Sequence, residues 1–207
     1  MHEIPSTILI ATKNRGKVAE IGDLVKDLPV NFLSLADVPN PPDVIEDGAT
    51  FEENALKKAR VIAKATGMVT LADDSGLCVD ALDGRPGVFS ARYAGEPATD
   101  AEKCDLILEE MQDVPAERRS ARFVCVIAVA TPEGAEQLFH GVCEGRITFE
   151  PRGKQGFGYD PIFYDEEAGR TFAEMERETK NRISHRGKAL RKFAEYLRGQ
   201  IAARSSE

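Results

Sequence analysis

The feature that most constrains the fold is a nearly continuous apolar run at residues 122–130, RFVCVIAVA. A strand with one face in water alternates apolar and polar residues, so an unbroken run predicts a central strand that is buried on both faces. Shorter runs predict strands at residues 7–11, 136–143 and 145–149, with a possible strand at 30–33. Apolar residues at helical spacing predict four helices, along residues 18–28, 51–66, 99–111 and 185–197.

Capping residues mark the starts of three of these helices. Thr50 and Thr99 are each followed three residues later by a glutamate, which is the capping-box pattern. Ser184 is the expected N-cap of the last helix, and Gly67 is expected to end the second. Because no linker or repeat appears, we assign residues 1–207 to a single domain, with two lobes, and expect 200–207 to form a flexible tail.

The composition is that of an ordinary globular protein, with 42% apolar and 30% charged residues. The formal net charge of -8 argues against broad binding to nucleic acid or anionic membranes, which requires a basic surface. No run has the length of a membrane-spanning helix, and residues 1–12 lack the basic start and long apolar centre of a signal peptide. We therefore expect a cytoplasmic protein that binds neither nucleic acid nor membrane.

Cysteine and histidine usage excludes a zinc site of the usual kinds. The four cysteines lack the spacing of metal ligands and mostly lie within apolar stretches, so we expect buried, reduced thiols at Cys78, Cys104, Cys125 and Cys143. Only three histidines are present, which excludes a site built from several of them.

Two adjacent carboxylates, Asp73 and Asp74, interrupt the apolar region at residues 68–93. Ser75-Gly76 follows, and apolar runs on both sides predict two strands joined by a tight turn. Such a turn places two carboxylates and a hydroxyl at one end of a sheet. Oxygen ligands of this kind suit Mg²⁺ or Mn²⁺, which usually also bind substrate phosphates. The alternative is an ordinary hairpin turn, because Asp, Ser and Gly are common turn residues.

Residues 12–17 (TKNRGK) connect the first strand to the first helix and collect polar side chains. Backbone N–H groups and the positive end of the helix dipole favour an anion at such a helix start. Lys13, Arg15 and Lys17 add cationic donors. Thr12 and Asn14 add neutral donors, although the GxxxxGK[ST] phosphate loop is absent. The alternative is a solvated basic connection in which Asn14 caps the helix.

Residues 154–163 (KQGFGYDPIF) contain the parts of a nucleobase pocket. Glycines let the backbone approach a ligand, the aromatic rings offer a stacking face, and Asp160 offers a hydrogen-bond acceptor. An aromatic hairpin that fills the core is the alternative. Further along, Lys180, His185 and Arg186 bring donors to the start of the last helix, for which a solvated basic helix end is the alternative.

Four motifs together resemble one family: TxNxxK after the first strand, ADDSGL, GFGYDPIF and SHRG, in this order and at these separations. The family is that of the inosine/xanthosine triphosphate pyrophosphatases, which hydrolyse non-standard purine nucleoside triphosphates. The resemblance extends from about Ile8 to Leu197 and includes the FEENALKKA and RPGVFSARYAG segments. It implies an α/β fold with a long, twisted mixed sheet flanked by helices, two lobes with the active cleft between them, and a homodimer.

The resemblance also implies roles for individual residues. Asp74 matches the catalytic carboxylate, which holds the metal ion and acts as general base, and Asp73 assists it. Asn14 and Lys17 are implied as the main triphosphate donors, with Lys58 as a helper. The implied substrate-binding set comprises Thr12, Lys13, Asn14, Arg15, Gly16, Lys17, Ser75, Phe157, Gly158, Tyr159, Asp160, Lys180, His185 and Arg186.

The implied chemistry is attack of a metal-activated water on the α-phosphorus, which expels pyrophosphate, with Mg²⁺ as cofactor and Mn²⁺ as a possible substitute. Donors such as His185, Arg186 or Lys180 aimed at a 6-oxo group reject a 6-amino base by ~10⁴. Two positions depart from the family pattern. Lys13 stands where a small residue is common, and Ile45 stands where a second metal-binding acid is sometimes found, with Glu46 beside it, so the number of metal ions stays open.

Other functions fit the sequence less well. A Maf-like pyrophosphatase acting on pyrimidine or modified nucleotides shares the architecture but lacks this pairing of SHRG with FGYD. A haloacid-type phosphatase is disfavoured because no DxDx[TV] follows a strand. A non-catalytic nucleotide-binding module predicts binding without turnover, and no loss of binding when Asp74 is replaced.

Overall fold

The computed structural model describes residues 5–95 and 97–204. Within these residues seven strands form one sheet in the order β2-β1-β3-β4-β5-β6-β7. β1 pairs in parallel with β2 and β3, whereas β6 pairs antiparallel with β5 and β7, so the sheet is mixed, as the family resemblance implied. The strands are β1 (Thr7–Ile10), β2 (Asn31–Ser34), β3 (Thr70–Val79), β4 (Ser120–Ala130), β5 (Glu136–Ile147), β6 (Phe163–Asp165) and β7 (Arg170–Thr171).

The α-helices among the described residues are α1 (Arg15–Val25), α2 (Phe51–Thr66), α3 (Asp100–Glu110), α4 (Arg177–Ile183) and α5 (His185–Arg204). Short 3-10 helices lie at Leu35–Asp37, Asp80–Leu82, Gly87–Arg92, Ala116–Arg118 and Phe172–Glu174. In the part of the chain described here, no helix combines the length and apolarity required to cross a membrane.

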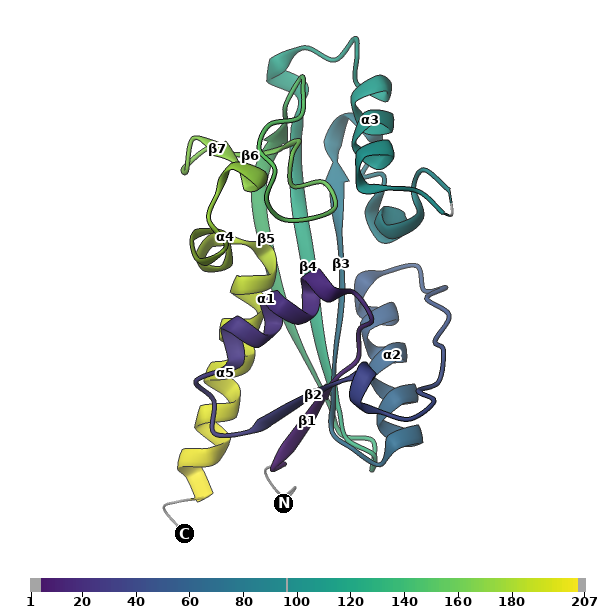
Figure 1. The fold of residues 1–207 in the computed structure, drawn as a ribbon, viewed down its shortest axis with the longest axis vertical. Coiled ribbons are helices and arrows are strands. Elements are labelled where there is room, and N and C mark those ends of the chain that lie inside the picture. The colour runs from purple at the N-terminus through teal and green to yellow at the C-terminus, as the bar shows by residue number, and fades with distance from the viewer. Residues whose placement is uncertain (1–4, 96, 205–207) are drawn as a thin grey trace. The chain divides into compact units, whose positions relative to one another are not determined.

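The chain divides into two compact units, and the first is built from three separate segments: Met1–Asp74, Cys125–Gly141 and Arg186–Glu207. Alternate residues of its strands pack on opposite faces of the sheet. Leu71 and Ile127 pack with Ile21 of α1 and with α5, while Ala72 and Val126 pack with α2 on the other face. Figure 1 shows α1 and α5 on one side of these strands and α2 on the other.

The second unit comprises Ser75–Val124 and Val142–His185. Its core joins the final residues of β3, the first residues of β4 and one face of α3. Phe123, Phe163 and Phe172 form an aromatic cluster in this core, and the ring centroids of Phe123 and Phe163 lie 4.6 Å apart. The cleft implied between two lobes stays a prediction.

Two of the three predicted N-caps are confirmed, at Thr50 and Thr99, while Ser184 is the C-cap of α4 and directly precedes α5. Thr50 accepts a hydrogen bond from the Glu53 N–H, and Gly67 ends α2 with a positive φ of 68°. Thr99 and Glu102 form a complete capping box at the start of α3. These local signals position the helices correctly because side-chain capping satisfies the free N–H groups at a helix start.

The predicted tight turn at Ser75-Gly76 is wrong. β3 continues as one strand from Thr70 to Val79 and carries Asp73, Asp74 and Ser75 in its interior. Tertiary partners outweigh the turn preference of these residues, because the buried Asp73 carboxylate is ion-paired with Arg186 rather than exposed in a turn.

β5 is likewise one strand where the sequence predicted two, at 136–143 and 145–149. Gly145 lies inside this strand. A Cβ at this position would approach the Tyr164 carbonyl oxygen of β6 to 2.4 Å, so close pairing of β5 with β6 requires a glycine here. The tail expected from residue 200 is helical as far as Arg204, and residues 205–207 lie outside the described residues. All four cysteines are free, as expected, and Cys78 is half-buried while the others are buried.

Candidate functional site

The loop between β1 and α1 is held by its own side chains. The Asn14 side-chain oxygen accepts from the Lys17 N–H at 3.0 Å, so Asn14 is the N-cap of α1, and the Thr12 hydroxyl accepts from the Asn14 N–H at 3.2 Å. Lys13 and Arg15 are exposed, and Gly16 and Lys17 are half-buried. Asn14 therefore caps α1. The first-turn N–H groups of α1 lie at the same end of the helix as the basic side chains.

A cavity of about 170 Å³ lies beside this loop in unit 1. Thr12 and Lys13 contribute from the loop, Lys58 and Ile62 contribute from α2, and Glu46 contributes from the preceding connection. Lys58 is paired with Glu46 at 2.6 Å. The cavity thus presents two lysines, Lys13 and Lys58, each paired with a carboxylate that also lines it, Asp43 and Glu46. Lysines beside a helix start suit phosphate groups.

Asp73 and Asp74 are neighbours on β3 and therefore project from opposite faces of the sheet. Asp73 shares the face of Leu71, against α1 and α5, and Asp74 shares the face of Ala72, against α2. Both carboxylates are buried, with 1% and 6% of their residue surfaces exposed. The two acids consequently have different partners.

Asp73 lies in a buried ionic cluster. Its carboxylate accepts from the Arg186 Nε at 2.8 Å, pairs with Lys17 and accepts from the Cys125 thiol at 3.2 Å. Arg186 also donates to the buried Glu20 of α1. Burial alone raises the pKa of Asp73, but the positive charges of Arg186 and Lys17 outweigh it and hold the pKa well below its usual range.

Asp74 has the opposite electrostatic balance. Burial is the largest influence and raises its pKa to about 6, Lys17 and Lys58 oppose this rise, and Glu46 adds to it. A carboxylate with this pKa is ionised at neutral pH and is basic enough to accept a proton from water in a reaction. Asp74 is therefore the acid in unit 1 whose ionisation responds to its surroundings near physiological pH.

Unit 2 holds the predicted base-binding loop, between β5 and β6. Asp160 is buried and accepts hydrogen bonds from the Phe157 N–H at 2.9 Å and from the Lys180 ammonium at 2.5 Å. That ammonium lies 4.8 Å from the centroid of the half-buried Phe157 ring. Gly156 has a positive φ of 76°, and a Cβ there would meet the Asp160 carboxylate at 2.0 Å, so only glycine fits.

Other predicted base-site residues take structural positions in unit 2. The buried Tyr159 donates its hydroxyl proton to the Ser90 carbonyl at 2.8 Å. The Gly158 N–H donates to Asp100 at 2.6 Å. His185 is buried and stacks on Phe123 with centroids 4.6 Å apart, and Ser75 is half-buried on β3.

Within each unit the structure groups several of the predicted residues. Lys17, Asp73 and Arg186 meet in unit 1, and Phe157, Asp160 and Lys180 meet in unit 2. Arg186, for which the resemblance implies a place in the base pocket, is paired with Asp73 and Glu20. Whether these residues contact substrate stays a prediction.

Glu20 is a residue that the sequence analysis missed. It lies three residues after Lys17, which places the two side chains on one face of α1. An acid on a helix face that also carries Ile21 and Val25 in the core is a recognisable sign of a buried ion pair.

Comparisons with known proteins cover almost the whole chain. The model of a family described as the Ham1 family matches residues 8–196. A dITP/XTP pyrophosphatase of Geobacter sulfurreducens is 52% identical over 190 residues, which are 92% of this chain and 96% of that protein. A dITP/XTP pyrophosphatase of Desulfotalea psychrophila is 54% identical over 183 residues, which are 88% of this chain and 81% of that protein.

Solved structures agree with these sequence matches. A HAM1 protein from Coxiella burnetii superposes with a TM-score of 0.86 at 48% identity, covering 93% of this chain and 98% of that one. A nucleoside-triphosphatase, dITP/XTP pyrophosphatase, from Mycobacterium abscessus gives a TM-score of 0.74 at 47% identity, covering 90% and 98%.

Proposed function

Because this chain belongs to the Ham1 family, we propose that it is a nucleoside triphosphate pyrophosphatase that hydrolyses non-standard purine nucleotides to the monophosphate and pyrophosphate. The names of its relatives support dITP and XTP as substrates, and ITP carries the same base as dITP. The structural observation that carries the proposal is the buried Asp74 carboxylate in the electrostatic range of Lys17 and Lys58, in the unit that also holds a phosphate-compatible cavity.

We assign phosphate binding to unit 1. The cavity is lined by Thr12, Lys13 and Lys58, and the connection that contains Thr12 and Lys13 leads directly into the N-terminus of α1, so several donors are available to one chain of phosphates. The pairs that these lysines form, Lys13 with Asp43 and Lys58 with Glu46, are at least partly exposed. The Lys13 pair is exposed and contributes only about 0–1 kcal/mol, so a triphosphate competes with it readily, whereas the Lys58 side chain is only 12% exposed.

A divalent metal is typical of this enzyme class, and we propose Mg²⁺, with Mn²⁺ as a substitute. Within the described residues no group of three or more His, Cys, Asp or Glu side chains gathers to hold an ion. The available donors are the carboxylates of Asp74 and Glu46, which interact electrostatically. This set fits Mg²⁺, because Mg²⁺ is usually held by one or two carboxylates together with waters and substrate phosphates. When bound, the ion neutralises phosphate charge and makes a bound water more acidic.

In the proposed reaction the oxygen of a water molecule forms a bond to the α-phosphorus, and the bond from that phosphorus to the bridging oxygen breaks. Asp74 orients this water and accepts its proton, and pyrophosphate leaves with the electron pair of the broken bond. Lys17 and the N–H groups of α1 stabilise the charge that develops on the phosphate oxygens. Asp73 holds Lys17 by an ion pair and so acts as a positioning residue.

Base selection is assigned to unit 2. The half-buried Phe157 ring provides a stacking surface, and the Asp160 carboxylate fixes the ammonium of Lys180 beside it. A 6-oxo group accepts a hydrogen bond from such a donor, whereas the 6-amino group of adenine leaves it unpaired. From the family resemblance we also propose a homodimer in the cytoplasm, and light scattering coupled to size-exclusion chromatography measures the former.

The test is pyrophosphate release from ITP, XTP, dITP, GTP, ATP and dTTP with Mg²⁺, using the wild type and Asp74→Asn. Fast release from the first three substrates alone, lost in the variant, supports the reaction and the role of Asp74. Asp47→Asn is the matched control, since Asp47 is exposed and paired with Lys57. Release from dTTP instead favours a Maf-like specificity. Binding without turnover of any nucleotide contradicts the proposal.

A further inference from the structure

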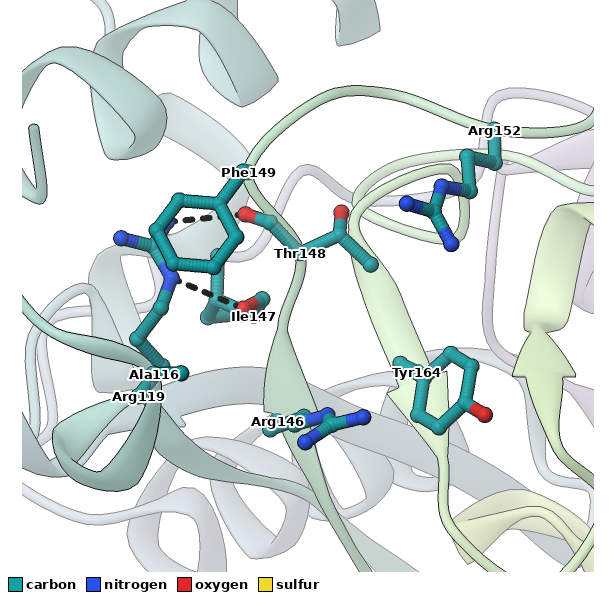
Figure 2. A pocket seen from close by; sticks show the side chains of 8 residues that line it. All are labelled: Ala116, Arg119, Arg146, Ile147, Thr148, Phe149, Arg152 and Tyr164. Atoms are coloured by element: carbon teal, nitrogen blue, oxygen red, sulfur yellow. Dashed lines mark hydrogen bonds between the residues drawn. The ribbon is translucent and has the colours of Figure 1, made fainter.

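Unit 2 contains a second concavity, which shares no residue with the predicted substrate-binding set. Its volume is about 230 Å³, and Figure 2 shows its lining of three arginines, two aromatic rings and three smaller contributors. The lining residues are Ala116, Arg119, Arg146, Ile147, Thr148, Phe149, Arg152 and Tyr164. Three cations around one small hollow are unusual in a chain whose formal net charge is -8.

Arg119 forms the rigid wall of this pocket. It is 2% exposed, and its guanidinium donates to the carbonyl oxygens of Ile147 and Thr148 at 2.9 and 2.8 Å, as Figure 2 shows. It also donates to the carbonyls of Met111 and Val114. No carboxylate in the described part of the chain pairs with it, and burial alone lowers its pKa. Its hydrogen bonds are made, but its positive charge has no protein counter-ion.

Phe149 packs against that charge and lines the pocket together with Arg119. Its ring lies 4.2 Å from the Arg119 guanidinium carbon although 63% of the residue is exposed. Tyr164 has the same relation to Arg146, at 4.7 Å. A large exposed aromatic ring costs free energy in water, and here each ring also excludes water from one side of a cation, which strengthens the attraction of that cation for an anion.

Arg146 and Arg152 are the exposed donors of the pocket. Each pairs with one exposed carboxylate, Arg146 with Glu166 at 3.1 Å and Arg152 with Glu150 at 3.6 Å. Each of these pairs uses one nitrogen, while a guanidinium presents five N–H donors. Because exposed pairs contribute about 0–1 kcal/mol, an anion with several oxygens displaces them at little cost.

We propose that this pocket binds a small phosphoryl anion, orthophosphate or pyrophosphate, between Arg146 and Arg152 and against the charged wall of Arg119. Planar guanidinium groups match the paired oxygens of a phosphoryl group. The pocket is smaller than the roughly 300–1,000 Å³ that enclose drug-sized ligands, which favours an inorganic anion over a whole nucleotide. The inference does not rest on the proposed function, because no residue is common to both sites.

The chain contains no tryptophan, so Phe149→Trp places a single fluorescent reporter at the pocket. The substitution suits this position because Phe149 is largely exposed. We expect metal-free Phe149→Trp protein to show a saturable change in tryptophan fluorescence when titrated with pyrophosphate or orthophosphate at constant ionic strength. Comparing the two titrations identifies the preferred anion, and binding at the predicted substrate site does not place a ligand at this reporter.

In the Phe149→Trp background, Arg146→Gln with Arg152→Gln is expected to weaken binding about tenfold or more, since both substitutions remove charge-assisted hydrogen bonds to the anion. Arg122→Gln is the matched control. Arg122 also lies on a strand, has a side-chain exposure of 39% against 44% for Arg146, and pairs with an exposed glutamate at 3.2 Å, but does not line the pocket. Binding by Arg122→Gln is expected to be unchanged.

A gain of affinity provides a result that misfolding cannot mimic. Glu150→Gln with Glu166→Gln removes the two competing carboxylates, and we expect tighter anion binding, whereas Glu144→Gln, which removes one of the two acidic partners of Arg122, leaves it unchanged. The proposal is overturned if the Phe149→Trp protein shows no saturable change, or if the arginine and glutamate variants titrate like their controls.

Discussion

The two faces of β3 in unit 1 place consecutive acids in opposite electrostatic surroundings. On the face of α1 and α5, Asp73 is paired with Arg186 and Lys17, and its pKa is held well below its usual range. On the face of α2, Asp74 interacts with Lys58 and Glu46, which themselves form a pair, and burial raises its pKa to about 6. Two adjacent aspartates thus behave differently: Asp73 carries a permanent charge, whereas the charge of Asp74 is titratable.

The difference in pKa assigns a structural role to Asp73 and a chemical role to Asp74. A fully paired buried carboxylate stays ionised throughout the physiological range and holds other groups in place, but it accepts no proton. A buried carboxylate whose pKa lies nearer neutrality can accept one. We therefore expect substitution of Asp74 to lower mainly the turnover, and disruption of the Asp73 cluster to lower mainly the stability.

The largest effect is expected for Asp74→Asn. Loss of a general base typically lowers turnover by about 10²–10⁴, so we expect kcat for dITP to fall within that range while the protein stays folded. Steady-state pyrophosphate release measures kcat, and circular dichroism checks the fold. Turnover within a factor of a few of wild type, with the Asp47→Asn control unaffected, would remove Asp74 from the reaction.

The next effect concerns stability and the other face of the strand. Arg186→Met leaves Asp73 and Glu20 buried without their shared cation, which typically costs about 3–5 kcal/mol. For a chain of this size that corresponds to a fall in Tm of roughly 6–20 °C. Arg198→Met, at an exposed position of the same helix, is the control. Adding Glu20→Gln to Arg186→Met removes a buried carboxylate charge that has lost the guanidinium, while Asp73 keeps its pair with Lys17, and is expected to recover part of the loss in a thermal melt.

A smaller effect tests the surroundings of Asp74 directly. Lys58 lowers the pKa of Asp74 and Glu46 raises it, so Lys58→Met should move this pKa up and Glu46→Gln should move it down. Carbon NMR titration of metal-free protein measures both. Shifts in the same direction in the two variants would contradict the electrostatic account of this face.

The raised pKa of Asp74 also links stability to pH. The folded protein binds this proton more tightly than the unfolded chain, whose reference pKa is 3.8. Asp74 therefore stabilises the fold below pH 3.8, and that contribution is lost as the pH rises through about 6. Relative to Asp74→Asn, the wild type should lose about 1–3 kcal/mol of unfolding free energy over this interval, as urea titrations at several pH values can measure.

The smallest effect is expected at the exposed pair of Lys13 and Asp43, whose side chains are 64% and 88% exposed. Asp43→Asn should change the unfolding free energy by less than about 1 kcal/mol. Because it removes a competitor for Lys13, it should also lower KM slightly if Lys13 binds phosphate. A raised KM with kcat unchanged would show that Asp43 itself supports substrate binding.

Much of the fold could be predicted because its signals are local or continuous. The run at 122–130 gave the buried central strand β4, and Thr50 and Thr99 located the starts of α2 and α3. The error at Ser75-Gly76 has a physical cause. The turn preference of Asp, Ser and Gly yields to tertiary contacts. Here Arg186, more than 100 residues away along the chain, pairs with Asp73 inside a strand.

The candidate site was predictable by residue type but not by partner. The motifs singled out Lys17, Asp74 and Lys180, all of which lie in buried or half-buried charged clusters. Sequence spacing did not reveal that Arg186 pairs with Asp73 and Glu20, because such pairing depends on which helices pack on which face of the sheet. Nor did it reveal the arginine pocket of unit 2, whose cations come from three separate places in the chain.

The construction of unit 1 from three chain segments has a consequence for biosynthesis. Glu20 and Arg186 are separated by 166 positions, and Asp73 and Arg186 by 113. While the ribosome is still adding residues before Arg186, the two acids of the cluster have been made but their guanidinium partner has not. The first unit therefore cannot complete its interior during most of translation, so a nascent chain stalled before Arg186 should be more susceptible to proteases than the released protein.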